Sequence, residues 1–160
     1  MIERKSDRID YWNKQYYGYW KKRVAEANKK LSGDSKIIKG DGIVSTNDNY
    51  FSAIDLLGIN NKSSVLEMGC GFGRSIPYLY KLTKNISAID ISESMLSAAK
   101  KDCKDFTGVK FILSEAEKTP FDSECFDYVI CYGTFDSTYQ NDTIKEINRI
   151  KTNCKNIRVT

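Results

Sequence analysis

The chain has 160 residues, 41% of them hydrophobic, and it carries 25 Lys and Arg against 21 Asp and Glu, for a net charge of +4. These values favour a single globular domain with a real core. They exclude a transmembrane helix, because no run approaches the roughly 20 apolar residues that a span needs. The opening Met-Ile-Glu-Arg-Lys lacks the apolar run of a secretory signal, so we expect a cytoplasmic chain with no membrane partner.

The five cysteines are scattered, odd in number and without a C-x-x-C pair. This spacing predicts neither a disulfide framework nor a zinc site, and we expect no bound metal. Structural thiols are a better interpretation than a reactive cysteine.

The first element is a predicted helix over 9–31 that is rich in aromatic residues. Residues 12, 16, 20 and 24 fall one turn apart and would share a face. Residues 1–30 hold nine Lys or Arg against four Asp or Glu, so the positive charge is concentrated there. A basic helix can meet nucleic acid or phosphorylated substrates, but a solvated face is the simpler interpretation, and nucleic acid is not favoured. Residues 33–49 are polar and indicate a loop or short hairpin.

The stretch from Val65 to Gly73 is the most informative part of the chain. A helix is predicted before it, over 46–57, with Thr46 or Asn47 as its cap and Gly58 as its terminator. The stretch itself begins as a short buried strand and ends in a turn with three glycines, and a helix over 74–82 follows. Such an elbow presents bare backbone and unpaired N–H groups to a ligand.

Two ligand classes compete for this elbow. A dinucleotide turn has the pattern G-x-G-x-x-G, and its last glycine position is occupied here by Arg74, which fits poorly. Glu67, two residues before the first glycine, instead suits a ligand that carries an ammonium group. A nicotinamide oxidoreductase is therefore disfavoured.

A second strand is predicted over 85–90, and it ends in Asp90. A carboxylate at the tip of a parallel strand can accept hydrogen bonds from both hydroxyls of a ribose. The alternative role, capping the next helix over 92–104, is better filled by Ser92. Further strands are predicted over 109–113 and 126–132, and then a helix over 141–150. The segment 131–138 should reach the reactive end of a ligand, because ligands of open parallel sheets lie beyond the carboxyl ends of the strands.

These motifs together resemble the class I S-adenosylmethionine-dependent methyltransferases. Glu67, Gly69, Gly71 and Gly73 match the family's first motif, an acidic residue followed by G-x-G-x-G. The segments 115–121 and 126–129 resemble its later motifs, and the resemblance covers 62–151. It implies an α/β, Rossmann-like, doubly wound parallel sheet over 46–160, preceded by an N-terminal helix and loop, 1–45, that cover the site.

The resemblance also implies the site residues. In related methyltransferases an N-terminal helix lies across the cofactor mouth, which suggests substrate or cofactor contacts for Tyr16 and Tyr17, although packing is an open alternative for both. Tyr132, Asp136 and Tyr139 are candidates near the mouth, more suited to shaping the pocket than to moving a proton. The expected cofactor-binding residues are Glu67, Gly69, Cys70, Gly71, Gly73, Arg74, Asp90, Ile91, Met95, Glu115, Ala116, Glu117 and Cys131.

The implied function is methyl transfer from S-adenosyl-L-methionine to a small molecule. The chain contains no histidine, which removes the commonest general base near neutral pH, and no catalytic residue can be assigned. This absence favours an amine or an ionised oxygen as the nucleophile. The alternative is a noncatalytic cofactor-binding or regulatory subunit.

The resemblance ends before the family's closing antiparallel strand pair. Residues 157–160 are expected to start a fifth strand, and without the closing pair a sheet edge would be exposed. We therefore expect a fragment, a chain that has lost catalysis, or an edge that a second copy or a partner chain covers.

Overall fold

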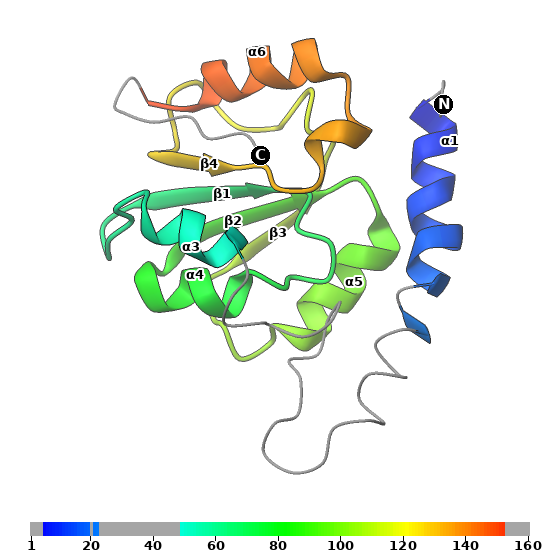
Figure 1. Ribbon diagram of the computed structural model, residues 1–160, viewed down its shortest axis with the longest axis horizontal. Helices are drawn as coiled ribbons and strands as arrows, with labels where there is room; N and C mark the ends of the chain where they lie inside the picture. Colours follow the sequence, from blue (N-terminus) through cyan, green and yellow to red (C-terminus); the bar gives the residue numbers. More distant parts are fainter. Residues whose placement is uncertain (1–4, 20, 23–48, 153–160) are drawn as a thin grey trace.

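The computed structural model describes residues 5–19, 21–22 and 49–152. Four parallel strands form one sheet in the order β3-β2-β1-β4 (Figure 1). The strands are β1 (Ser64–Met68), β2 (Asn85–Asp90), β3 (Lys110–Leu113) and β4 (Tyr128–Ile130). The predicted α/β parallel sheet is therefore confirmed for its first four strands. The fifth strand expected to start over 157–160, and with it the sheet edge expected to be exposed, lies outside the described residues. So does the loop expected over 33–49, except for Asn49, which begins α3.

Helices cover both faces of the sheet, as a doubly wound fold requires. Figure 1 shows α3 (Asn49–Asp55), α4 (Ile76–Leu82) and α5 (Glu93–Asp102) on one face and α6 (Gln140–Ile150) on the other. Side chains of a strand point alternately to the two faces, so β1 contributes side chains to a hydrophobic core on each face of the sheet. Val65 packs in the core under α3, α4 and α5, whereas Leu66 and Met68 pack in the core under α6.

Three predicted boundaries shift in the structure. The helix expected from residue 74 begins at Ile76, because Gly73 has a positive φ of 79° and the chain turns before the helix starts. The strand expected over 126–132 is regular only over β4, and Phe126 makes an isolated bridge to Lys151 instead. The helix expected over 46–57 ends at Asp55, and its candidate caps at 46 and 47 lie outside the described residues.

The N-terminal element differs most from expectation. It begins as α1 (Lys5–Asp10) and continues as the π-helix η1 (Tyr11–Tyr16) before α-helical residues 17–19, so it is not one regular α-helix. A π-helix brings residues five apart onto one face. Tyr11 and Tyr16 have that spacing, and their ring centroids are 5.9 Å apart. The wider turn thus gathers aromatic rings that an α-helix would spread around its surface. No helix in the described parts of the chain is long and apolar enough to span a membrane.

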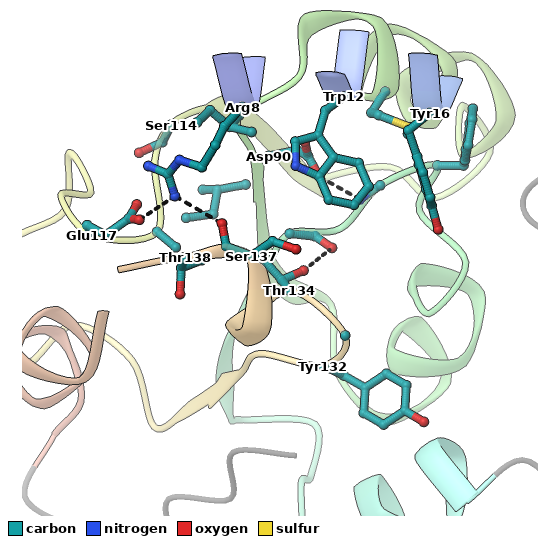
Figure 2. A pocket seen from close by; sticks show the side chains of 18 of the residues that line it. Arg8, Trp12, Tyr16, Asp90, Ser114, Glu117, Tyr132, Thr134, Ser137 and Thr138 are labelled. Atoms are coloured by element: carbon teal, nitrogen blue, oxygen red, sulfur yellow. Dashed lines mark hydrogen bonds and ion pairs between the residues drawn. The ribbon is translucent and has the colours of Figure 1, made fainter. Parts of the chain in front are cut away.

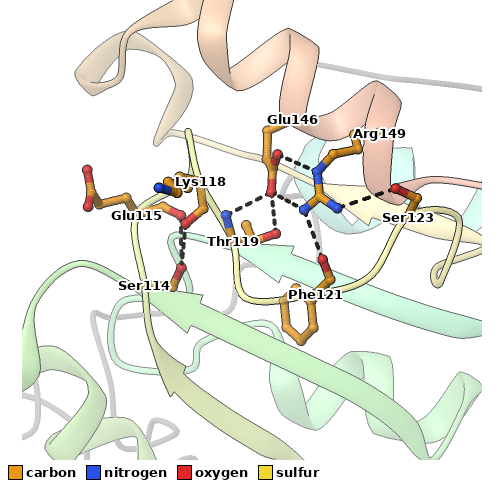
Figure 3. Close-up of polar contacts among 8 residues, drawn as sticks. All are labelled: Ser114, Glu115, Lys118, Thr119, Phe121, Ser123, Glu146 and Arg149. Atoms are coloured by element: carbon orange, nitrogen blue, oxygen red, sulfur yellow. Dashed lines mark hydrogen bonds and ion pairs between the residues drawn. The ribbon is translucent and has the colours of Figure 1, made fainter.

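A polar cluster between α6 and the segment after β3 holds this side of the fold together (Figure 3). The Glu146 carboxylate accepts hydrogen bonds from the Thr119 backbone N–H at 2.7 Å and from the Thr119 hydroxyl at 2.5 Å. Arg149 donates to the same carboxylate at 2.7 and 2.8 Å and to the Phe121 carbonyl at 2.9 Å. The cluster therefore fixes the chain that leaves β3 against α6.

We expect Glu146→Gln to lower the free energy of unfolding at pH 7 by about 2 kcal/mol. Burial alone would raise the pKa of Glu146, but the hydrogen bonds from Arg149 and Thr119 outweigh it and lower the pKa from 4.5 to about 2. The folded state thus holds its proton less tightly than the unfolded state. The stabilisation is complete above about pH 4.5 and is lost as the pH falls toward 2.

Urea unfolding between pH 2 and 7 measures this effect. The variant should show a shallower loss of stability in acid than the unchanged chain. Asp142→Asn on the same helix is the matched control, because its ion pair with Lys145 is exposed and should contribute less than about 0.5 kcal/mol. If the free energy of unfolding fell equally between pH 4.5 and 2 in Glu146→Gln and in the unchanged chain, the role given to this carboxylate would be contradicted.

Candidate functional site

The glycine turn after β1 is held open by backbone hydrogen bonds to β2. The N–H groups of Gly69 and Cys70 donate to the Ile89 carbonyl at 2.8 and 2.9 Å. Gly71 has a φ of 52°, and a Cβ built on it would meet no atom within 4 Å. Gly71 also lines a cavity at this edge of the sheet, so its bare backbone forms an open cradle there.

Asp90 is the last residue of β2 and closes the other side of this cradle. Its Oδ2 accepts from the Gly71 N–H at 2.9 Å, and its Oδ1 accepts from the Ser92 N–H at 2.8 Å. Burial raises the pKa of Asp90, and the hydrogen bonds from the Ser92 and Gly71 N–H groups oppose that rise. Each carboxylate oxygen has a second lone pair for another donor. The Ser92 hydroxyl accepts from the Met95 N–H at 3.2 Å, so Ser92 caps α5 as predicted.

A cavity of about 260 Å³ lies at the carboxyl ends of the strands (Figure 2). The segments that meet there are α1 and η1, the glycine turn, the start of α5, and the segments after β3 and β4. Ten of the eighteen predicted site residues line it: Gly69, Gly71, Arg74, Asp90, Ile91, Met95, Ala116, Glu117, Tyr16 and Tyr132. Whether they contact a cofactor or substrate stays a prediction.

The other eight do not line the cavity: Glu67, Cys70, Gly73, Glu115, Cys131, Tyr17, Asp136 and Tyr139. Glu67 is buried and accepts a hydrogen bond from the Ser75 hydroxyl. A Cβ on Gly73 would come within 2.8 Å of the Cys103 sulfur, so this glycine allows close packing of α5 on the turn. Tyr17 stacks on Phe72, with ring centroids 5.6 Å apart.

The described cysteines are protonated thiols. Cys70, Cys103 and Cys131 are buried. Burial, together with the charges of nearby carboxylates, raises the pKa of Cys70 well above its usual value and the pKa of Cys131 to about 12. These properties suit the structural interpretation of the sequence. In the described parts of the chain, no group of three or more Cys, Asp or Glu side chains is placed to hold a metal ion.

Several cavity residues were not named individually as site residues: Arg8, Trp12, Phe72, Ser114, Gly133, Thr134, Ser137 and Thr138. The last four lie in the segment 131–138, which was expected to reach the reactive end of the ligand. Arg8, Trp12 and Tyr16 follow one another at four-residue intervals, so the aromatic stripe was the available signal for Arg8. The residues after β3 and β4 lie in irregular segments, where no periodicity indicates which side chains face inward.

The N-terminal helices contact three separate parts of the site. Arg8 forms an ion pair with Glu117, at 2.6 Å between Nη1 and Oε1. Asn13 accepts hydrogen bonds at its Oδ1 from the Ser92 hydroxyl at 2.7 Å and from the Ser94 N–H at 3.2 Å. Together with the Tyr17 stack, these contacts hold α1 and η1 across the carboxyl end of the sheet (Figure 1).

The family follows from comparison with known proteins. Residues 66–153, more than half of the chain, match the methyltransferase domain family. The chain belongs to the class I S-adenosylmethionine-dependent methyltransferases. This membership confirms the resemblance seen in the motifs and decides against the dinucleotide-binding alternative.

Two curated methyltransferases illustrate the relationship. The chain is 38% identical over 101 residues to the ubiquinone/menaquinone biosynthesis C-methyltransferase UbiE of Rickettsia prowazekii (strain Madrid E), covering 57% of this chain and 41% of that protein. It is 31% identical over 98 residues to a demethylmenaquinone methyltransferase of Staphylococcus aureus (strain JH9), covering 59% and 41%. The chain thus aligns with about two fifths of the length of these methyltransferases.

The fold of this methyltransferase domain also matches solved structures. A SAM-dependent methyltransferase from Aquifex aeolicus superposes with a TM-score of 0.60 at 24% identity, covering 81% of this chain and 67% of that one. At this identity the likeness supports the fold alone.

Proposed function

We propose that this chain binds S-adenosyl-L-methionine in the cavity and transfers its methyl group to a small-molecule nucleophile. The observation that carries the proposal is the meeting of Gly71 and Asp90 at one wall of the cavity. An open backbone cradle lies there directly beside a buried carboxylate. An amino-acid tail and a ribose need these two surfaces side by side.

The residues present fit the cofactor along its length. The amino-acid tail would lie against Gly69 and Gly71, and Asp90 would accept hydrogen bonds from the ribose hydroxyls through its remaining lone pairs. Ile91 and Met95 would border the adenine, with the Ala116 backbone at its edge. Arg74 lies in the turn, two residues before α4 begins, and would contact the carboxylate end of the amino-acid tail.

When bound, the sulfonium supplies an activated methyl group, so few catalytic side chains are needed. The chain's contribution is to bind, orient and exclude water. Trp12 and Tyr16 line the cavity from η1, and an aromatic face attracts a nearby cation. The N-terminal segment, through α1 and η1, would act as a cap over the bound cofactor.

The proposed acceptor is a small molecule with an amine or an oxygen nucleophile. The chain has no histidine, and a nucleophile that needs little activation suits such a site. A carbon nucleophile is the second candidate, because a relative that aligns at 38% identity is named as a C-methyltransferase. Transfer to carbon likewise demands an acceptor that is activated by its own substituents.

Calorimetric titration with S-adenosylhomocysteine tests the cofactor proposal. We expect the unchanged chain to bind with a dissociation constant in the roughly micromolar range, and Asp90→Ala to weaken binding by about 30-fold through loss of the ribose contacts. Asp102→Ala, at the far end of α5, is the control and should leave the affinity unchanged. Equal affinities for Asp90→Ala and the unchanged chain would remove the proposed ribose site. Cofactor binding without transfer to any acceptor would favour the noncatalytic alternative.

A further inference from the structure

We propose that Arg8 and Glu117 together bind a neutral hydroxyl group of the methyl acceptor. This inference rests on the proposed function, and it assigns to the same cavity a preference for one chemical class of acceptor. It starts from buried polar atoms that have no partner in the described parts of the chain. These are Nε and Nη2 of Arg8 and Oε2 of Glu117.

Arg8 and Glu117 are held in place by contacts that do not involve these three atoms. Nη1 of Arg8 donates to Glu117 Oε1 at 2.6 Å and to the Ser137 carbonyl at 3.1 Å. Glu117 Oε1 also accepts from the Tyr139 N–H at 2.8 Å. The guanidinium carbon lies 4.5 Å from the centroid of the Tyr139 ring. These contacts fix the guanidinium and the carboxylate while one edge of each stays unsatisfied.

Both side chains are more than nine-tenths buried, with exposed fractions of 7% for Arg8 and 9% for Glu117. Leaving buried donors and acceptors without partners costs free energy, and native proteins rarely accept that cost without a ligand or an ordered water. Both residues line the cavity, and Figure 2 shows them at its edge beside Ser137 and Thr138. The unsatisfied atoms therefore belong to two residues that a ligand in the cavity would contact.

The position of the pair points to the acceptor rather than the cofactor. Asp90, Ile91 and Met95 line the cavity at the β2 side, where we place the ribose and the purine. Glu117 contacts the segment after β4 instead, because its Oε1 accepts from the Tyr139 N–H at 2.8 Å and its partner Arg8 donates to the Ser137 carbonyl at 3.1 Å. The ion pair thus stands at the β4 side of the cavity, which the proposed cofactor pose leaves for the second substrate.

The charges select the class of ligand. The pair carries one positive and one negative charge, so an anionic group would be opposed by Glu117 and a cationic group by Arg8. A hydroxyl can accept from an Arg8 N–H and donate to Glu117 Oε2 at the same time. Trp12 and Tyr16, which also line the cavity, suit an aromatic body carrying that hydroxyl.

Binding of matched aromatic probes tests this assignment. Naphthol, its methyl ether and naphthoate would be titrated into the chain saturated with S-adenosylhomocysteine. We expect naphthol to bind at least about tenfold more tightly than either comparison probe, because a site built around a hydroxyl rejects analogues that lack it. Equal affinities for the three probes would overturn the assignment.

Variants separate recognition from the folding of the N-terminal helices. In Arg8→Lys the ammonium can still pair with Glu117 and Ser137, but the free guanidinium edge is gone, so the preference for naphthol should fall below about twofold. Glu117→Gln should reduce the same preference. Lys14→Met is the matched control, because its exposed ion pair with Asp10 lies away from the cavity and the preference should persist.

The two proposals fail in different ways. If S-adenosylhomocysteine does not bind the unchanged chain, the proposed function fails. If it binds with similar affinity to the unchanged chain and to Arg8→Lys while the naphthol preference survives in Arg8→Lys, only the role of Arg8 in acceptor recognition is overturned.

Discussion

Gly71→Arg should lower the affinity for S-adenosylhomocysteine by at least about 1,000-fold, the largest effect that we expect on binding. A Cβ at this position meets no atom within 4 Å, and the position lines the cavity. A long side chain would therefore extend into the space proposed for the amino-acid tail. The added guanidinium would also stand close to Asp90, whose Oδ2 accepts from the Gly71 N–H, and would compete with the ribose for that carboxylate.

The control for Gly71→Arg must carry the same backbone strain. Gly58 has a φ of 73°, compared with 52° for Gly71, and a Cβ there also meets no atom within 4 Å. Because Gly58 does not line the cavity, Gly58→Arg should bind the cofactor as the unchanged chain does. Calorimetry on both variants, with circular dichroism to verify folding, measures the difference. A folded Gly71→Arg that binds normally would show that the cofactor does not lie on this turn.

Gly69→Ala should lower the free energy of unfolding by about 3 kcal/mol, the largest stability effect that we expect from a single methyl group. Gly69 has a φ of 72°, and a Cβ there would lie 1.9 Å from the Thr134 hydroxyl oxygen and 2.6 Å from the Thr134 Cβ. Rotation of the threonine side chain moves its oxygen but cannot move its Cβ. The segment after β4 must therefore shift away from the turn.

Urea unfolding of a double-mutant cycle isolates this contact. Thr134→Gly removes the obstructing atoms, so Gly69→Ala should cost at least about 1 kcal/mol less in that background than in the unchanged chain. Gly108→Ala is the control for strain alone, because Gly108 has a φ of 90° and its Cβ would meet nothing within 4 Å. If Gly69→Ala and Gly108→Ala lowered the free energy of unfolding equally, the close approach of the glycine turn to the segment after β4 would be contradicted.

The sheet and the cradle were predictable because their signals are local. The strand pattern of 85–90 and its terminal Asp90 predicted both β2 and the carboxylate at its tip, and the structure has the strand over the predicted residues. Ser92 was predictable as a cap because a short polar side chain before an apolar helical pattern has one dominant use. Features of this kind depend on residues that are neighbours in the sequence, so tertiary packing changes them little.

Contacts across segments distant in sequence were not predictable. Arg8 and Glu117 are 109 residues apart, and nothing in either segment indicates that they pair. Glu115 was expected at the site together with Glu117, yet only Glu117 lines the cavity, because irregular backbone after β3 sets which of them points inward. Likewise, the α-helical periodicity of the segment did not indicate the π-helix η1, in which the ring centroids of Tyr11 and Tyr16 are 5.9 Å apart.

A crystal structure of the chain with S-adenosylhomocysteine tests the central claim most directly. We predict the ribose hydroxyls on Asp90, the amino-acid tail against Gly69 and Gly71, and the sulfur facing the segment after β4. Density for the ligand away from the glycine turn, or a cavity filled by the chain's own side chains with no room for a nucleoside, would contradict the account.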